Sequence, residues 1–206
     1  MPANISIFTG VKKLRVDLEL EPDDYRMMIF AWKCQAIETR FSFTRKEFMD
    51  GCLLLGVNSI NGLKEKLTSA MINQTFNQDH EDFLRMYLFA YDFTLTHYKV
   101  KIGERPFPLV IPAEVAIALW QKIYYNRQPL ILERWLAFLK ENPCVISRRD
   151  WLMFPTFVVD NGTDFSGYVA KDYFPPIYDE FVQREKYRLN ALGCSCGSKK
   201  NVGLNK

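Results

Sequence analysis

Apolar residues recur three and four positions apart along much of this chain, a spacing that places them on one face of an α-helix. The first such helix is predicted over residues 23–38, where the shared face consists of Met27, Phe30, Ala31 and Cys34. Further apolar side chains extend around much of the same helix, so neighbouring elements have to cover it. The chain is therefore constrained to fold as a packed, largely helical domain.

Start and stop signals divide the rest of the chain into helices. Thr44 with Glu47 three residues later is a capping box, and Gly56 is a typical C-terminal stop, so a helix is predicted over 45–55. Residues 96–111 lack helical periodicity and contain a glycine and two prolines, which predicts a loop. Other helices are predicted over 59–72, 80–95 and 112–125, from Pro129, from Arg148 behind a Ser147 cap, and over 175–189.

Two short segments alternate apolar and polar residues, and each precedes a predicted helix: Ile5-Ser6-Ile7 and Phe41-Ser42-Phe43. Such a pair suggests a small ribbon between two helix-loop-helix units, as in paired EF-hands. The alternating carboxylates and central glycine of a calcium loop are absent from both segments. We therefore predict an all-α fold of EF-hand-like units with at most a tiny two-stranded ribbon; a degenerate calcium sensor is an alternative.

The composition is that of one sizeable globular domain. At 206 residues and 48% hydrophobic content, the chain can form a packed core. Residues 183–206 hold six basic residues and one acidic residue, Glu185, so the remainder is slightly acidic and nucleic-acid binding is not expected. The predicted domain spans 5–190, followed by a basic disordered tail at 191–206. We expect a monomer. The irregularly placed cysteines indicate a reducing compartment, cytoplasm or nucleus.

Residue types that carry catalysis or bind metal are sparse. The two histidines, His80 and His97, have no evident nucleophilic partner, and surface positions are the simpler interpretation. Cys194 and Cys196 form a lone pair, a weak metal signal. An inert tail or a reversibly acylated one are the alternatives, which leaves membrane contact open. We predict no cofactor, no metal and no catalytic residues of the chain's own.

Two groups of side chains each allow a structural and a functional interpretation. One is a stripe that is either ordinary core or a groove for an amphipathic helix: Phe8, Met27, Phe30, Ala31, Phe43 and Phe93. The other is a carboxylate cluster near Tyr173 that is either a solvated helix face or a patch for a basic partner: Asp150, Asp172, Asp179 and Glu180. Residue types alone do not decide between these interpretations.

A series of motifs in fixed order resembles the potentiating-neddylation domain of the defective-in-cullin-neddylation (DCN-like) family. The similarity covers about residues 5–188, and no single motif is diagnostic. The motifs are Ala31-Trp32-Lys33, Phe43-Thr44-Arg45-Lys46-Glu47-Phe48, Ala116-Ile117-Ala118-Leu119-Trp120, Trp135-Leu136-Ala137-Phe138-Leu139-Lys140-Glu141-Asn142-Pro143, Ile146-Ser147-Arg148 and Tyr178-Asp179-Glu180-Phe181-Val182.

The resemblance implies a scaffold-type co-ligase that promotes cullin neddylation without catalytic residues. In the family, one groove holds the N-terminally acetylated helix of a neddylation conjugating enzyme. By position it would use Phe8, Val11, Met27, Phe30, Ala31, Cys34, Phe43, Phe89 or Phe93, Leu119 and Ile123. A second surface binds the C-terminal winged-helix subdomain of a cullin, with or without its RING partner. It would use Asp150, Tyr173, Asp179 and Glu180.

Departures from the family pattern concern mainly the second surface. Asp179 matches one family aspartate, but Tyr173 stands where the family has alanine. Arg149, beside Asp150, occupies the position of the other aspartate, and Lys171 replaces an acidic residue. These changes lower the negative charge and add bulk. The alternative is therefore a binding-only paralogue that sequesters the conjugating enzyme or another acetylated helix. The first helix-loop-helix unit is also expected to be shortened.

Overall fold

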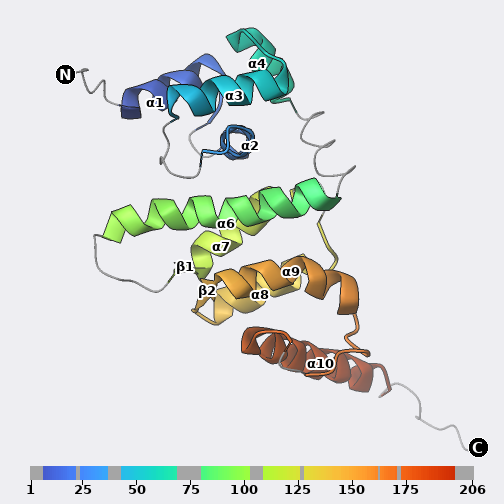
Figure 1. The fold of residues 1–206 in the computed structure, drawn as a ribbon. Helices are drawn as coiled ribbons and strands as arrows, with labels where there is room; N and C mark the ends of the chain where they lie inside the picture. Colours follow the sequence, from blue (N-terminus) through green and yellow to red (C-terminus); the bar gives the residue numbers. More distant parts are fainter. Residues whose placement is uncertain are drawn as a thin grey trace, which may run out of the picture. The chain divides into compact units, whose positions relative to one another are not determined.

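The computed structural model describes residues 7–21, 24–36, 43–68, 80–102, 109–125, 128–161, 163–170 and 173–197. They form α1 (Ile7–Asp17), α2 (Tyr25–Lys33), α3 (Arg45–Leu55), α4 (Ile60–Lys66), α6 (His80–Ile102), β1 (Val110–Pro112), α7 (Ala113–Ile123), α8 (Leu132–Glu141), β2 (Val145–Ser147), α9 (Arg148–Asn161) and α10 (Pro176–Gly197) (Figure 1). The chain divides into two compact units: unit 1 comprises 1–111 and 118–126, and unit 2 comprises 112–117 and 127–206. None of the helices described is long and apolar enough to cross a membrane.

The described part of the chain contains one two-stranded sheet, in which β1 pairs with β2. The all-α fold with a tiny ribbon is therefore confirmed, but the ribbon lies elsewhere than predicted. Ile7 begins α1, Phe43 precedes α3, and the remaining residues of the two alternating segments lie outside the described residues. The strands instead come from β-branched segments that lead directly into α7 and α9, and they bury Ile111 and Ile146 completely.

Local end signals placed α3 correctly. The Glu47 N–H donates to Thr44 Oγ1 at 3.1 Å, and the Thr44 N–H donates to Glu47 Oε2 at 2.7 Å, which completes the capping box. Gly56 ends the helix with a φ of 65°, a conformation that glycine adopts without a steric penalty. These signals act within a few residues, so the sequence was sufficient to predict this helix.

Other helix ends differ from the prediction. α6 continues to Ile102, into the segment 96–111 that was predicted as a loop, and α10 continues to Gly197, past the predicted end at Leu189. Periodicity marks only the part of a helix that packs on a core, so it does not report a helix that extends beyond that part. α2 is shorter than predicted, because the chain turns at Gln35, whose φ is 51°.

In unit 1, α2 packs against both α3 and α6 (Figure 1). Its buried residues are Met28, Ile29, Phe30 and Ala31. Lys33 of α2 lies 3.8 Å from the carboxylate of Asp82 on α6, an ion pair that joins the two helices. Trp120 of α7 donates from Nε1 to the Tyr87 hydroxyl on α6 at 2.7 Å, and both side chains are fully buried. α6 is therefore linked to α2 on one side and to α7 on the other.

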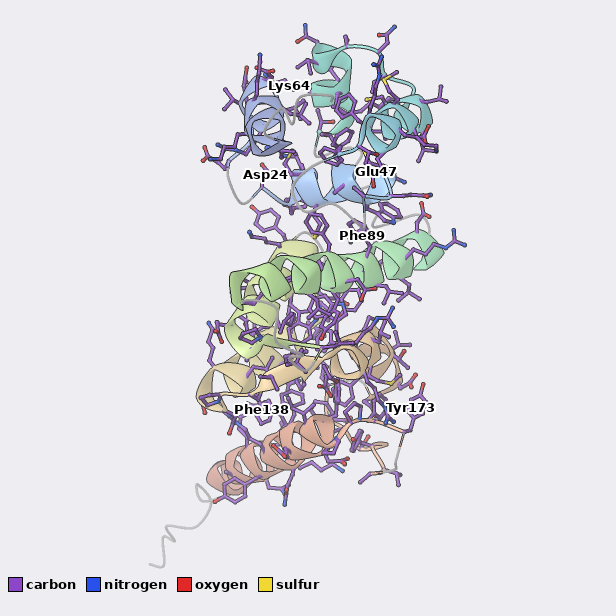
Figure 2. The ribbon with its side chains drawn as sticks, turned by 60° about the vertical axis from the view of Figure 1, so that its left-hand side comes forward. Asp24, Glu47, Lys64, Phe89, Phe138 and Tyr173 are labelled. Carbon is purple, nitrogen blue, oxygen red and sulfur yellow. The ribbon has the colours of Figure 1, made fainter. Side chains whose placement is uncertain are left out.

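Unit 2 has an aromatic core between α8, α9 and α10. Trp135 of α8 stacks on Tyr178 of α10 with ring centroids 4.9 Å apart, and Figure 2 shows Phe138 between α8 and α10. Further rings of this core include Phe154, Phe157, Phe165 and Phe181. Glu185 is buried beside them with 3% of its surface exposed, and it accepts hydrogen bonds from Arg134 at 2.8 Å and Arg188 at 2.9 Å. Sequence reasoning had counted Glu185 only as a charge in a basic segment.

Candidate protein-binding surfaces

The residues of the predicted acetylated-helix groove all belong to unit 1. Most come from three helices, while Val11 lies on α1 and Phe43 just before α3. α2 contributes Met27, Phe30 and Ala31, and Cys34 is its C-cap residue; α6 contributes Phe89 and Phe93, and α7 contributes Leu119 and Ile123. The side chain of Phe8 lies outside the described residues.

Three phenylalanine rings meet where α2 contacts α3. The Phe30 ring centroid lies 5.2 Å from that of Phe43 and 5.6 Å from that of Phe48, both edge to face. The α3 capping box sits between Phe43 and Phe48 in the chain, so the same cap that starts the helix also orients these two rings against α2. Phe48 was not among the predicted residues, although it ends the motif that begins with Phe43.

Two more rings stack on α6. Phe89 and Phe93, one helical turn apart, have centroids 5.4 Å apart. Phe89 is 8% exposed and lies on the face of α6 turned toward α2 (Figure 2), whereas Phe93 is half-buried. Phe93 therefore extends the aromatic surface of α6 from the buried Phe89 toward solvent.

Burial separates the predicted groove residues into two sets. The buried set forms part of the core of unit 1: Phe30, Ala31, Cys34, Phe89, Leu119 and Ile123. The half-buried set can reach a partner without rearrangement: Val11, Met27, Phe43 and Phe93. Burial raises the pKa of the Cys34 thiol to about 12, so this sulfur is a packed, protonated group. The assignment of either set to a partner stays a prediction.

The predicted carboxylate patch belongs to unit 2, and Asp150 in it caps a helix. The Ser147 N–H donates to Asp150 Oδ2 at 2.7 Å, and the Asp150 N–H donates to Ser147 Oγ at 3.2 Å, which confirms the predicted Ser147 cap. The Tyr178 hydroxyl donates to the backbone carbonyl of Asp150 at 2.5 Å. The bond from Tyr178 ties the first turn of α9 to the first turn of α10.

Asp179 lies in the first turn of α10, where negative charge is favoured, and Glu180 follows it directly. The Tyr168 hydroxyl donates to Asp179 Oδ1 at 2.6 Å. Burial, this hydrogen bond and the negative charge of Asp179 all raise the pKa of Tyr168, so the phenol stays protonated and keeps donating. Glu180 is exposed. Sequence reasoning missed Tyr168, because a tyrosine in a loop gives no periodic signal.

The two residues that depart most from the family pattern contact each other. Arg149 Nη2 donates to the backbone carbonyl of Tyr173 at 3.0 Å. Tyr173 lies in the segment that leads into α10 (Figure 2), and 53% of its surface is exposed. Its ring packs edge to face on Phe174, with centroids 4.9 Å apart. The other two residues that sequence reasoning placed here, Lys171 and Asp172, lie outside the described residues.

The side chains of the remaining candidates for chemistry lie outside the part of the chain that the structure describes. His80 and His97 both fall in α6, and their side chains lie outside the described residues, as do those of Cys194 and Cys196. Among the residues that the structure describes, no three histidine, cysteine or carboxylate side chains gather in a way that could hold a metal ion.

The family model described as "Cullin binding" matches residues 62–184, more than half of the chain. The chain belongs to this DCN-like family. It is similar to DCN1-like protein 3 of Homo sapiens, with 35% identity over 187 residues, 89% of this chain and 58% of that protein. Its similarity to DCN1-like protein 3 of Xenopus tropicalis is 35% over 182 residues, 87% of this chain and 56% of that protein.

A more distant relative is DCN1-like protein 3 of Drosophila melanogaster, 26% identical over 181 residues, which are 87% of this chain and 50% of that protein. The chain thus spans about half the length of the curated relatives that it matches. The range that matches the DCN-like family model includes α6, α7 and the whole carboxylate patch, whereas α1, α2 and α3 precede it.

Proposed function

We propose that this chain promotes cullin neddylation as a scaffold, binding a cullin and a neddylation conjugating enzyme at the same time. The observation that carries the proposal is the match to the cullin-binding family over 62–184, a range that contains the exposed carboxylate end of α10. The names of the relatives, DCN1-like protein 3, point to the same family.

The cullin side of the proposal uses Asp179 and Glu180. Asp179 lies in the first turn of α10 and accepts a hydrogen bond from Tyr168, and Glu180 is the exposed residue that follows it. Such a surface suits a partner with basic side chains, whose charge complementarity adds association rate and specificity. We propose that this partner is the C-terminal winged-helix subdomain of a cullin.

The conjugating-enzyme side uses the half-buried apolar residues of unit 1, Met27, Phe43 and Phe93. Apolar side chains at a helix surface accept the apolar face of another helix. An N-terminal acetyl group removes the charge of the terminal amine. A charged amine would lose much of its hydration in an apolar site, which costs free energy. The proposed ligand is therefore the N-acetylated N-terminal helix of the conjugating enzyme.

The rate gain in this proposal comes from proximity. Binding two reactants to one scaffold makes their encounter effectively intramolecular, which raises the effective concentration of the acceptor lysine near the loaded enzyme. The scaffold supplies no nucleophile. We also propose a location in the cytoplasm, the nucleus or both, which imaging of the tagged full chain would check.

Two measurements test the function. Calorimetry with an acetylated conjugating-enzyme peptide and its unacetylated twin should show binding of the acetylated form alone. A neddylation assay with purified components should show faster cullin modification when the chain is added. Binding of the peptide without any acceleration of cullin neddylation would rule out the co-ligase function.

Peptide binding without faster neddylation would support a second function, that of a binding-only paralogue that sequesters the conjugating enzyme or another acetylated helix. One specific observation favours this alternative. The carboxylate patch contains the Arg149–Tyr173 contact, which places a basic and a bulky residue where the resembling family has an aspartate and an alanine.

A further inference from the structure

A continuous series of contacts links the exposed ring of Tyr173 to the half-buried carboxylate of Asp179 in unit 2. Arg149 holds the backbone carbonyl of Tyr173 at 3.0 Å, and the Tyr173 ring packs on Phe174. Phe174 in turn lies 5.9 Å from the Tyr168 ring, centroid to centroid, and the Tyr168 hydroxyl donates to Asp179 at 2.6 Å. The aromatic group and the carboxylate are therefore held by one set of packed side chains.

The two ends of this series remain available to a partner. Tyr173 is 53% exposed, although Tyr178, which packs on the same Phe174 ring, is fully buried. Asp179 is half-buried and its Oδ1 accepts from Tyr168, but within the part of the chain that the structure describes its Oδ2 accepts no hydrogen bond. A half-exposed tyrosine presents a large amphipathic ring with only two side-chain torsions, which is why tyrosine is frequent among residues that dominate binding energy.

We propose that Tyr173 and Asp179 form a two-part anchor, aromatic and acidic, and that Arg149 and Tyr168 are its positioning residues. The inference rests on the proposed function, because the partner is the cullin surface of that proposal. The partner chemistry is a basic side chain next to an apolar recess: the basic group pairs with Asp179, and the recess accepts the Tyr173 ring.

Preorganisation is the physical reason for the two positioning residues. A partner that has to order a loop and a rotamer on binding loses affinity to the entropy of that ordering. Tyr168 keeps the Asp179 carboxylate in one orientation, and Arg149 keeps the backbone at Tyr173 in one place. Removing either contact should weaken binding without removing a group that touches the partner.

The first experiment measures binding of the full chain to a panel of cullin C-terminal winged-helix subdomains by calorimetry. Tyr173→Ala and Asp179→Ala are each expected to weaken binding by about tenfold or more, the range of a dominant interface residue. The matched control is Tyr187→Ala, which removes a tyrosine that is 79% exposed on α10, and it should leave affinity within about twofold. Thermal unfolding of each variant checks that it folds.

The second experiment separates positioning from general stability by double-mutant cycles. Tyr168→Phe keeps the ring and removes the hydroxyl. As a single substitution it should weaken cullin binding, and in the Asp179→Ala background it should have no further effect. Arg149→Met keeps the aliphatic stem, and its effect should vanish beside Tyr173→Ala. A merely structural role would leave each effect unchanged in the second background.

The outcomes distinguish the anchor from the function on which it rests. Three results together support the anchor: the unaltered chain binds a cullin, each of the four single variants binds it more weakly, and the losses within each pair do not add. Cullin binding that is insensitive to Tyr173→Ala overturns the anchor and leaves the proposed function in place. No binding of any cullin by the unaltered chain overturns the proposed function and the anchor together.

Discussion

A Cβ atom added to Gly51 of α3 would lie 2.3 Å from the Cys34 sulfur and 3.1 Å from the Cys34 Cα. A glycine in a helix interior lowers helix stability, so its presence here needs a reason, and the close approach of α3 to the end of α2 supplies it. Gly51 thereby helps to keep Phe43 and Phe48, which flank the start of α3, against Phe30 of α2.

Gly51→Ala should therefore destabilise the chain by about 1–3 kcal/mol through overpacking. Denaturant unfolding measures the change. Gly10→Ala is the matched control, because Gly10 lies in α1 and a Cβ there meets nothing within 4 Å. Helix propensity predicts that this control gains up to ~1 kcal/mol. Equal effects of the two substitutions would contradict the packing explanation.

The buried carboxylate of unit 2 allows a second prediction. Glu185→Ala should lower the free energy of unfolding by about 2–4 kcal/mol, because it leaves Arg134 partly buried without its carboxylate. Arg188→Ala should cost less than about 1 kcal/mol, since the Arg188 side chain is 44% exposed and water screens its pairing with Glu185. Chemical denaturation of both variants checks the ranking, and a larger loss from Arg188→Ala would refute it.

The predicted helix-binding surface is tested better at Met27 than at Ala31. Ala31 is 2% exposed, so a charge there would disrupt the core as well as any binding, whereas Met27 is half-buried. Met27→Arg should abolish binding of the acetylated peptide by calorimetry while the chain stays folded, because a charge would face the apolar ligand. Met49→Arg, at a 57% exposed position on α3, is the control and should bind normally. Unchanged affinity of Met27→Arg would place the groove elsewhere.

Cysteine reactivity should follow burial. The pKa of Cys34 is raised to about 12, so at pH 8 the folded chain holds this thiol protonated and covered. Iodoacetamide followed by peptide mapping should modify Cys34 only after unfolding. Because the folded pKa exceeds the unfolded one, the associated stability is fully present below about pH 9 and is lost as the pH rises toward 12. Rapid modification of Cys34 in the native chain would show that α2 opens locally.

Sequence reasoning succeeded where the physical cause is local or repeated. Thr44, Glu47 and Gly56 lie within thirteen residues of one another and set both ends of α3. Ser147 and Asp150 likewise form their cap within one turn. The order of short motifs over most of the chain identified the DCN-like family, which the family match over 62–184 confirmed.

Tertiary structure decided the features that join residues far apart in the chain. Arg149 and Tyr173 are 24 positions apart, and Arg134 and Glu185 are 51 positions apart, so no local pattern predicts either contact. The same holds for the ribbon, whose strands pair across α7 and α8. The sequence by itself determined roughly where the helices lie, the caps of α3 and α9, and the family. Only the packing of distant segments decided which carboxylate is buried, which glycine permits close approach and which tyrosine faces solvent, because burial depends on what the rest of the chain places beside a residue.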